Sequence, residues 1–122
     1  MIDAQRLEEI CRAAGAMALA RWPGAGHVLD SWEKQPGDPV SEADLAVDAF
    51  LRQELGALLP AAGWLSEESA DSPERLACGL IWLVDPIDGT RDFIRGRSGW
   101  CVSVALISAG RPLIGALVAP AR

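Results

Sequence analysis

The chain has 122 residues, half of them hydrophobic, and a formal net charge of −6. This length and composition predict one globular domain over residues 1–122 and argue against a disordered chain. The negative charge argues against a basic surface for nucleic-acid polymers, and no apolar run is long enough to span a membrane.

The predicted elements begin with a helix over residues 3–22, where apolar side chains recur at helical spacing and Asp3 is the expected N-cap. A short strand is expected over 27–33, and the Pro-Gly pair predicts a loop over 34–39. A second helix is expected from Ser41, because the Ser-Glu-Ala-Asp segment matches a capping box.

Strand-like segments dominate the second half of the chain. A short strand is expected at 63–68, and the apolar run over 79–85 is typical of a strand buried on both faces. A short helix at 91–95 precedes two strand-like runs separated by residues 109–110, which indicates a hairpin. The predicted fold class is therefore α+β, with two helices packed on a mainly antiparallel sheet.

The N-terminal segment is acidic and amphipathic, unlike a secretory signal. The three cysteines, Cys11, Cys78 and Cys101, are far apart and lack metal-type spacing. They are interpreted as buried free thiols, and both features favour a cytoplasmic protein.

Acidic residues gather where predicted elements begin or end. Asp44 lies in the first turn of the second helix, and Glu67 and Glu68 end a strand. Asp85 and Asp88 flank the turn expected after the most apolar strand. Helix capping, solvated loop acids and turn chemistry explain the three groups separately. Their common position at element ends favours one shared site at one edge of the sheet.

A site made of carboxylates suits a hard cation such as Mg²⁺, which prefers oxygen ligands and leaves positions for water or a substrate phosphate. A cation would also cancel the repulsion between Asp85 and Asp88. The carbonyl of Ile87 would face the same space, and Gly89 would let the backbone approach a ligand. The free amide groups that begin a short helix at Thr90 would bind a phosphate oxygen.

Three segments, in order, resemble the inositol monophosphatase-like superfamily of Mg²⁺-dependent, Li⁺-sensitive phosphatases. DPIDGTRDF, from Asp85, resembles the D-P-I-D-G-T signature. PVSEADLAVD, from Pro39, resembles V-T-x-A-D, and WLSEES, from Trp64, resembles G-E-E-S with Ser66 where glycine is usual. The resemblance begins at about Lys34 and implies the N-terminal half of the family's layered fold.

The resemblance implies metal-binding roles for individual residues. Glu67, Asp85 and the Ile87 carbonyl would hold a first Mg²⁺, so Glu67 would take part in catalysis. Asp85 and Asp88 would share a second ion. Two metal ions neutralise a phosphate, activate water and stabilise the leaving alkoxide. A histidine-dependent phosphatase is disfavoured, because the single histidine, His27, matches no motif.

The resemblance also implies how water and phosphate would be held. Asp44, paired with Thr90, would orient the attacking water, with a third metal ion as a further contact of Asp44. The amides of Gly89 and Thr90 would cradle the phosphate. Lys34 aligns with a lysine often found before V-T-x-A-D, and the alternative is an exposed loop lysine.

The substrate prediction depends on the residues after the signature. Arg91 and Asp92 resemble the basic-then-acidic pair of 3′(2′),5′-bisphosphate nucleotidases, which favours removal of the 3′-phosphate of adenosine 3′,5′-bisphosphate. Arg91 would meet the second phosphate, and the alternative is that it pairs with Asp92 or Asp88. An inositol or other sugar-like monophosphatase is the second candidate. A noncatalytic metal-binding remnant is the candidate from another class.

No segment resembles the W-D motif that supplies the last ligand of the second metal in the second half of family members. Residues 1–122 are therefore interpreted as the N-terminal half of a phosphatase and are expected to be inactive, or nearly so, on their own. The resemblance further implies a small phosphorylated metabolite as the ligand and a homodimer as the assembly.

Overall fold

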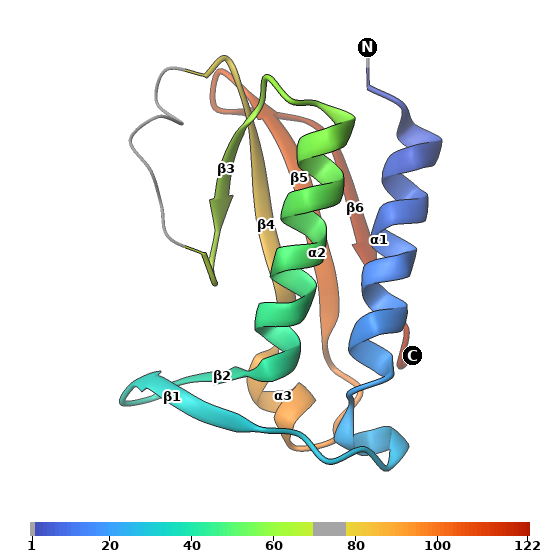
Figure 1. Cartoon of the computed structure of the whole chain (residues 1–122), viewed down its shortest axis with the longest axis vertical. Coiled ribbons are helices and arrows are strands. Elements are labelled where there is room, and N and C mark those ends of the chain that lie inside the picture. Colours follow the sequence, from blue (N-terminus) through green and yellow to red (C-terminus); the bar gives the residue numbers. More distant parts are fainter. Residues whose placement is uncertain (1, 70–77) are drawn as a thin grey trace.

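The structure, a computed structural model, describes residues 2–69 and 78–122. Two helices lie side by side over one face of a four-stranded sheet with the order β3-β4-β5-β6 (Figure 1). The elements, in chain order, are α1 (Ala4–Leu19), the 3₁₀ turn η1 (Pro23–Ala25), β1 (Ser31–Gln35), β2 (Asp38–Ser41), α2 (Glu42–Leu58), β3 (Gly63–Ser66), β4 (Leu80–Asp88), α3 (Thr90–Ile94), β5 (Cys101–Ser108) and β6 (Arg111–Val118).

The pairing of the strands confirms the α+β class with a mainly antiparallel sheet. β3 runs parallel to β4, whereas β4 with β5 and β5 with β6 are antiparallel pairs. The predicted hairpin at 109–110 is present, because Ala109 and Gly110 have φ angles of 49° and 78°. Positive φ at both positions is what a tight two-residue hairpin turn requires.

The helix starts follow the predicted caps. Asp3 caps α1, and Ser41 caps α2 through a capping box in which Ser41 and Asp44 exchange side-chain and backbone hydrogen bonds. The first helix ends at Leu19, earlier than predicted. The amides of Arg21 and Trp22 donate to carbonyls three positions back, which tightens the chain before Pro23, a residue that cannot donate in a continuing helix.

The predicted strand over 27–33 and loop over 34–39 are both wrong in their bounds. The strand β1 begins at Ser31, and β2 returns antiparallel to it around Pro36 and Gly37. Gly37 has a φ of 81°, which suits the third position of a type II turn with proline before it. The Pro-Gly pair therefore makes a two-residue turn between strands instead of a long loop.

The strand β4 differs from its prediction in burial. Trp82 and Val84 face the helices and are buried, whereas Leu83 between them is 46% exposed. Only one face of this strand is covered by the described residues, so the expectation of burial on both faces is wrong here. An alternating pattern of this kind is typical of a sheet covered on one side.

The predicted turn between Asp85 and Asp88 is also wrong, because β4 continues through Asp88. Asp85 is opposite Ser103 and Asp88 is opposite Cys101, so three steps along β4 match two along β5. This extra residue is a β-bulge, which bends the strand and changes the direction of its side chains. The chain turns only at Gly89, which has a φ of 93°.

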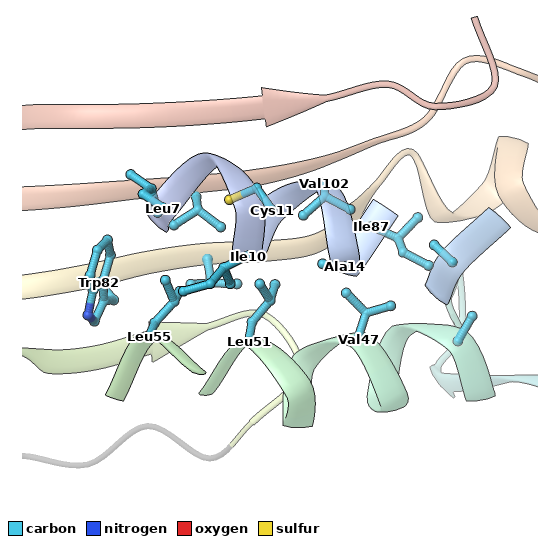
Figure 2. Close-up of a cluster of buried hydrophobic side chains, with 14 of the residues drawn as sticks. Leu7, Ile10, Cys11, Ala14, Val47, Leu51, Leu55, Trp82, Ile87 and Val102 are labelled. Atoms are coloured by element: carbon cyan, nitrogen blue, oxygen red, sulfur yellow. The ribbon is translucent and has the colours of Figure 1, made fainter. Parts of the chain in front are cut away.

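The hydrophobic core lies between the two helices and the inner face of the sheet (Figure 2). Its largest contributions come from α1, α2, β4 and β5, through Leu7, Ile10, Cys11, Val47, Leu51, Leu55, Trp82, Val84, Ile87 and Val102. Because Ile87 belongs to this core, the bulged end of β4 is anchored to the helices. In the described residues no helix has the length and apolarity needed to cross a membrane.

The cysteines differ in burial. Cys11 lies in the core, and burial raises the pKa of its thiol to about 11, so the thiol stays protonated at neutral pH. Cys78 and Cys101 are only partly buried. The prediction of buried thiols is therefore confirmed for Cys11 and wrong for the other two.

Candidate functional site

The parallel pairing of β3 and β4 brings an acidic residue that follows β3 beside one that lies within β4. Ser66 is opposite Val84 in this pair, and the next amide, that of Glu67, donates to the Val84 carbonyl over 3.4 Å. One residue further along each strand, Glu67 and Asp85 are therefore neighbours. Sequence reasoning placed both at strand ends, which is wrong for Asp85 because β4 continues to Asp88. The parallel register explains why the two acids meet.

An open cleft of about 260 Å³ lies at this end of the sheet. It contains most of the residues predicted for the site, together with Asp38 and Pro39 of β2. The lining residues are Lys34, Asp38, Pro39, Glu67, Glu68, Asp85, Ile87, Gly89, Thr90 and Arg91. The structure therefore gathers acids, a lysine, an arginine and a glycine-containing turn around one solvent-filled space.

Asp88 is not among the residues that line this cleft. It is exposed and lines a separate hollow of about 280 Å³ with Trp100, Cys101 and Arg122. The bulge in β4 accounts for this difference, because it changes the direction of the side chains that follow Asp85. The predicted sharing of one ion by Asp85 and Asp88 stays a prediction.

Asp44 is 1% exposed and lies behind the cleft, where it holds two segments at once. One carboxylate oxygen accepts hydrogen bonds from the Ser41 amide at 2.8 Å and its hydroxyl at 2.6 Å. The other oxygen accepts from the Thr90 hydroxyl at 2.7 Å. Helix capping and pairing with Thr90, weighed as alternatives from the sequence, are both present.

The Thr90 hydroxyl is also 3.0 Å from the carbonyl oxygen of Ile87. A hydroxyl has one proton, so it donates fully to only one of these two acceptors at a time. This contact links the Asp44–Thr90 pair to the carbonyl predicted as a metal ligand.

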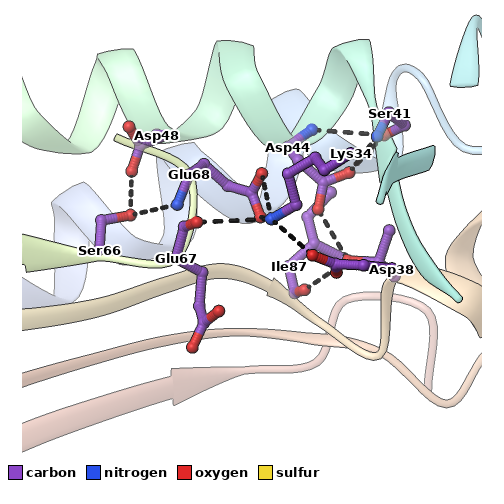
Figure 3. A network of polar contacts seen from close by, with 10 residues as sticks. Lys34, Asp38, Ser41, Asp44, Asp48, Ser66, Glu67, Glu68 and Ile87 are labelled. Carbon is purple, nitrogen blue, oxygen red and sulfur yellow. Dashed lines mark hydrogen bonds and ion pairs between the residues drawn. The ribbon is translucent and has the colours of Figure 1, made fainter. Parts of the chain in front are cut away.

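Lys34 is exposed, as the alternative of an exposed loop lysine expected, but it lies in strand β1 and not in a loop. Its ammonium group lies 3.1 Å from a carboxylate oxygen of Glu68, 3.5 Å from the carbonyl oxygen of Glu67 and 3.7 Å from a carboxylate oxygen of Asp38 (Figure 3). Burial alone would lower the pKa of Lys34, but the hydrogen bond and negative charge of Glu68 outweigh it and raise the pKa.

The Glu68 carboxylate is better buried than a solvated loop acid, since its side chain is 6% exposed. Burial raises the pKa of Glu68, even though Lys34 acts in the opposite direction. The lysine therefore compensates only part of the cost of holding this carboxylate away from water. Sequence reasoning missed this pairing, because the partners are far apart in the chain.

Asp85 carries the strongest sign of crowded negative charge. Burial, followed by the charges of Asp88, Glu67, Glu68 and Asp44, raises its pKa from 3.8 to about 6. The groups in the cleft that could bind a metal ion are carboxylate and carbonyl oxygens, which is the chemistry that Mg²⁺ prefers.

The carboxylates around the cleft do not all point to one position. In residues 2–69 and 78–122, no three His, Cys, Asp or Glu side chains are placed together closely enough to hold an ion. Figure 3 shows the Glu67 carboxylate directed away from Lys34 and Glu68. Glu67 is exposed, so its side chain can turn toward Asp85 without moving the core.

Arg91 lies on the rim of the cleft and donates to the carbonyl oxygen of Gly37 over 3.1 Å. Asp92 instead forms an ion pair with Arg97, at 3.8 Å. The alternative in which Arg91 pairs with Asp92 or Asp88 is therefore wrong for this structure. The arginine connects α3 to the turn of the β1–β2 hairpin.

Comparison with known proteins adds the family to this geometry. The model of the inositol monophosphatase family matches residues 4–122. The chain belongs to the inositol monophosphatase family. Family membership confirms the resemblance that the three segments carry.

Individual relatives agree with the family assignment. The chain is 36% identical over 118 residues to the 3′(2′),5′-bisphosphate nucleotidase CysQ of Salmonella typhimurium, covering 93% of the chain and 48% of that protein. It is 45% identical over 83 residues to the histidinol-phosphatase of Mycobacterium tuberculosis, covering 68% of the chain and 31% of that protein.

The fold comparison gives the same result. The extragenic suppressor protein suhB of Bartonella henselae superposes with a TM-score of 0.84 and 28% identity, over 96% of the chain and 45% of that structure. The chain thus spans about half the length of the curated CysQ relatives and less of the histidinol-phosphatase.

Gly89 is required by the backbone around it. A Cβ atom at this position would lie 2.8 Å from the Gly99 carbonyl oxygen, in addition to the unfavourable φ of 93°. Sequence reasoning expected the glycine to make room for a ligand. The structure shows that it also makes room for a neighbouring segment of its own chain.

We predict that Gly89→Ala destabilises the chain more than Gly110→Ala. Both glycines have positive φ, with a cost of about 1–2 kcal/mol for alanine, but a Cβ at Gly110 has nothing within 4 Å. The free energy of unfolding from urea titration measures both. Equal losses would show that contact with Gly99 contributes nothing.

The raised pKa of Asp85 predicts a pH dependence for the metal-free chain. Folding disfavours the charged form of this carboxyl group. The cost to stability is smallest below the unfolded pKa of 3.8, and it grows as the pH rises through about 6. The free energy of unfolding should fall by about 1 kcal/mol between pH of about 5 and 7.5 from this group.

Asp85→Asn should remove that part of the slope and make the metal-free chain more stable than wild type near neutral pH. Asp30→Asn, at an exposed position, is the matched control and should leave the slope unchanged. An unaltered slope in Asp85→Asn would contradict the assignment of this pH dependence to Asp85.

Proposed function

We propose that the complete protein is a Mg²⁺-dependent phosphomonoesterase acting on a small phosphorylated metabolite, with the 3′-phosphate of adenosine 3′,5′-bisphosphate as the favoured substrate group. The observation that carries this proposal is that the parallel pairing of β3 and β4 places Glu67 next to Asp85, beside the Asp44–Thr90 pair. Family membership and the similarity to CysQ nucleotidases support it.

Glu67, Asp85 and the carbonyl oxygen of Ile87 would hold the first Mg²⁺, and Asp88 would join Asp85 at a second. Bound Mg²⁺ supplies charge neutralisation of the phosphate and a lowered pKa of the attacking water. The chain's own part is to present these oxygens side by side through the parallel pairing of β3 and β4. The same proposal includes inhibition of the complete enzyme by Li⁺.

Asp44 and Thr90 would orient the attacking water. When the Thr90 proton is directed to Asp44, its hydroxyl lone pairs remain available to accept a hydrogen bond from that water. The same orientation releases the Ile87 carbonyl from its contact with Thr90. Burial of Asp44 keeps this arrangement rigid, because its second oxygen is held by Ser41.

The phosphate would be held by the amides of Gly89 and Thr90, with Lys34 as a positive charge on the opposite wall of the cleft. Arg91 would meet a second phosphate on the same ligand. Its contact with Gly37 uses one of five guanidinium N–H donors, and the arginine is exposed on the rim. An exposed guanidinium with remaining donors is well suited to a phosphate.

A monophosphate substrate, such as an inositol or other sugar-like phosphate, is the second candidate. One relative is named a histidinol-phosphatase, but histidinol is neither an inositol nor a sugar, so that similarity does not favour the second candidate. The two candidates differ in whether Arg91 contributes to substrate binding.

We predict that Asp85→Asn in the complete enzyme abolishes Mg²⁺-dependent phosphate release, because an amide oxygen carries no charge to bind the ion. Asp30→Asn should retain wild-type turnover. Residues 1–122 alone are expected to show little or no release. Wild-type rates from Asp85→Asn would remove Asp85 from the mechanism.

We predict that Arg91→Ala lowers kcat/KM for adenosine 3′,5′-bisphosphate by about 1.5–3 kcal/mol of transition-state stabilisation, the range for hydrogen bonds to charged groups. The loss for inositol 1-phosphate should be small, because it offers no second phosphate. Arg97→Ala, on the same segment, is the matched control. Equal losses on both substrates would make Arg91 structural, and a wild-type preference for the monophosphate would favour the second candidate.

A further inference from the structure

Asp48 is a buried carboxylate to which neither the family motifs nor the proposed mechanism gives a role. It lies on α2, is 6% exposed and accepts a hydrogen bond from the hydroxyl of Ser66 at the end of β3. The same hydroxyl oxygen accepts from the amide of Glu68 at 3.2 Å (Figure 3). One serine therefore joins the helix to the turn that carries Glu67 and Glu68.

The position of Asp48 on α2 places this contact one helical turn from Asp44. Asp44 and Asp48 are four residues apart, so they lie on the same face of the helix, one turn from each other. Asp44 holds Thr90, which follows β4, whereas Asp48 holds Ser66, the last residue of β3. One face of a rigid helix thus sets the relative positions of the two strand ends that meet at the cleft.

The chemistry of Ser66 suits this link. A serine hydroxyl donates one hydrogen bond and accepts others, so it can bond to the carboxylate and the amide at once. A buried carboxylate also needs such a donor, because an unpaired one is costly. The glycine that is usual in the resembling G-E-E-S segment could make neither bond.

We infer that Asp48 and Ser66 are positioning residues that hold the turn carrying Glu67 in place for metal binding. The inference rests on the proposed metal site. Residues that orient metal ligands without touching the ion commonly change metal affinity by about 10–100-fold when they are replaced. The consequence for this chain is that removing the Ser66 hydroxyl weakens the metal site while the core stays folded.

The test is Mn²⁺ binding to the purified chain, measured as the dissociation constant by electron paramagnetic resonance, with circular dichroism as the check on folding. Ser66→Ala should weaken binding by about 10–100-fold, and Ser66→Thr, which keeps the hydroxyl, should restore it. Ser108→Ala removes the same group at the other end of the sheet, opposite Leu80, and should bind as wild type.

Asp48 is tested in the same assay. Asp48→Ala should weaken binding as Ser66→Ala does, and the double variant should be no weaker than either, because both changes break one link. Asp48→Asn keeps an acceptor for Ser66 and should stay close to wild type. A large loss of Mn²⁺ affinity in Asp48→Asn would show that the charge of Asp48 matters and would overturn the positioning role. This outcome decides the question even if Ser66→Ala fails to fold.

Two further outcomes separate this inference from the proposed function. Wild-type affinity in Ser66→Ala and Asp48→Ala overturns the inference alone, since the metal site is then independent of the link. Absence of Mn²⁺ binding by the wild-type chain at millimolar concentrations overturns the proposed metal site and the inference with it.

Discussion

Mutual repulsion among carboxylates at one end of the sheet is the constraint on which the rest of the structure depends. The acids come from α2, from the turn after β3 and from β4. Burial, followed by the charges of these acids, raises the pKa of Asp85. Within the described chain, Lys34 is the cation that forms ion pairs with acids of the cleft. Its contact with Glu68 leaves the charge on Asp85 uncompensated, which is the physical reason to place a metal ion there.

The fold carries this unfavourable cluster because the surrounding segments are held independently. The core anchors β4 through Val84 and Ile87 on either side of Asp85. The helix α2 contributes core residues on one face and buried acids at its N-terminal end. Stability gained by burial of the apolar face therefore offsets the cost of positioning charges at the end of the same helix.

The predictable features were those encoded by neighbouring residues. The capping box at Ser41 and the hairpin at 109–110 depend on contacts within a few positions, and both were found as predicted. The acids at strand ends could be located for the same reason. The parallel register that makes Glu67 a neighbour of Asp85 then follows from the arrangement of the sheet.

The features that were missed depend on partners far away in the sequence. Asp-Pro and Asp-Gly are local turn signals, but pairing with β5 keeps Asp85–Asp88 in a bulged strand. The burial of Glu68 and the Asp48–Ser66 bond depend on how α2 and the β1–β2 hairpin pack against β3. No local pattern in the sequence specifies these tertiary contacts.

The central claim is that the acids at the β3 and β4 ends form a metal site. Anomalous diffraction from crystals of the chain soaked in Mn²⁺ tests it most directly, because the ion is located without reference to activity. The account predicts an anomalous peak in the cleft, bound by Glu67, Asp85 and the carbonyl oxygen of Ile87. An empty cleft at saturating Mn²⁺, or a peak bound by Asp88 without Asp85, would contradict it.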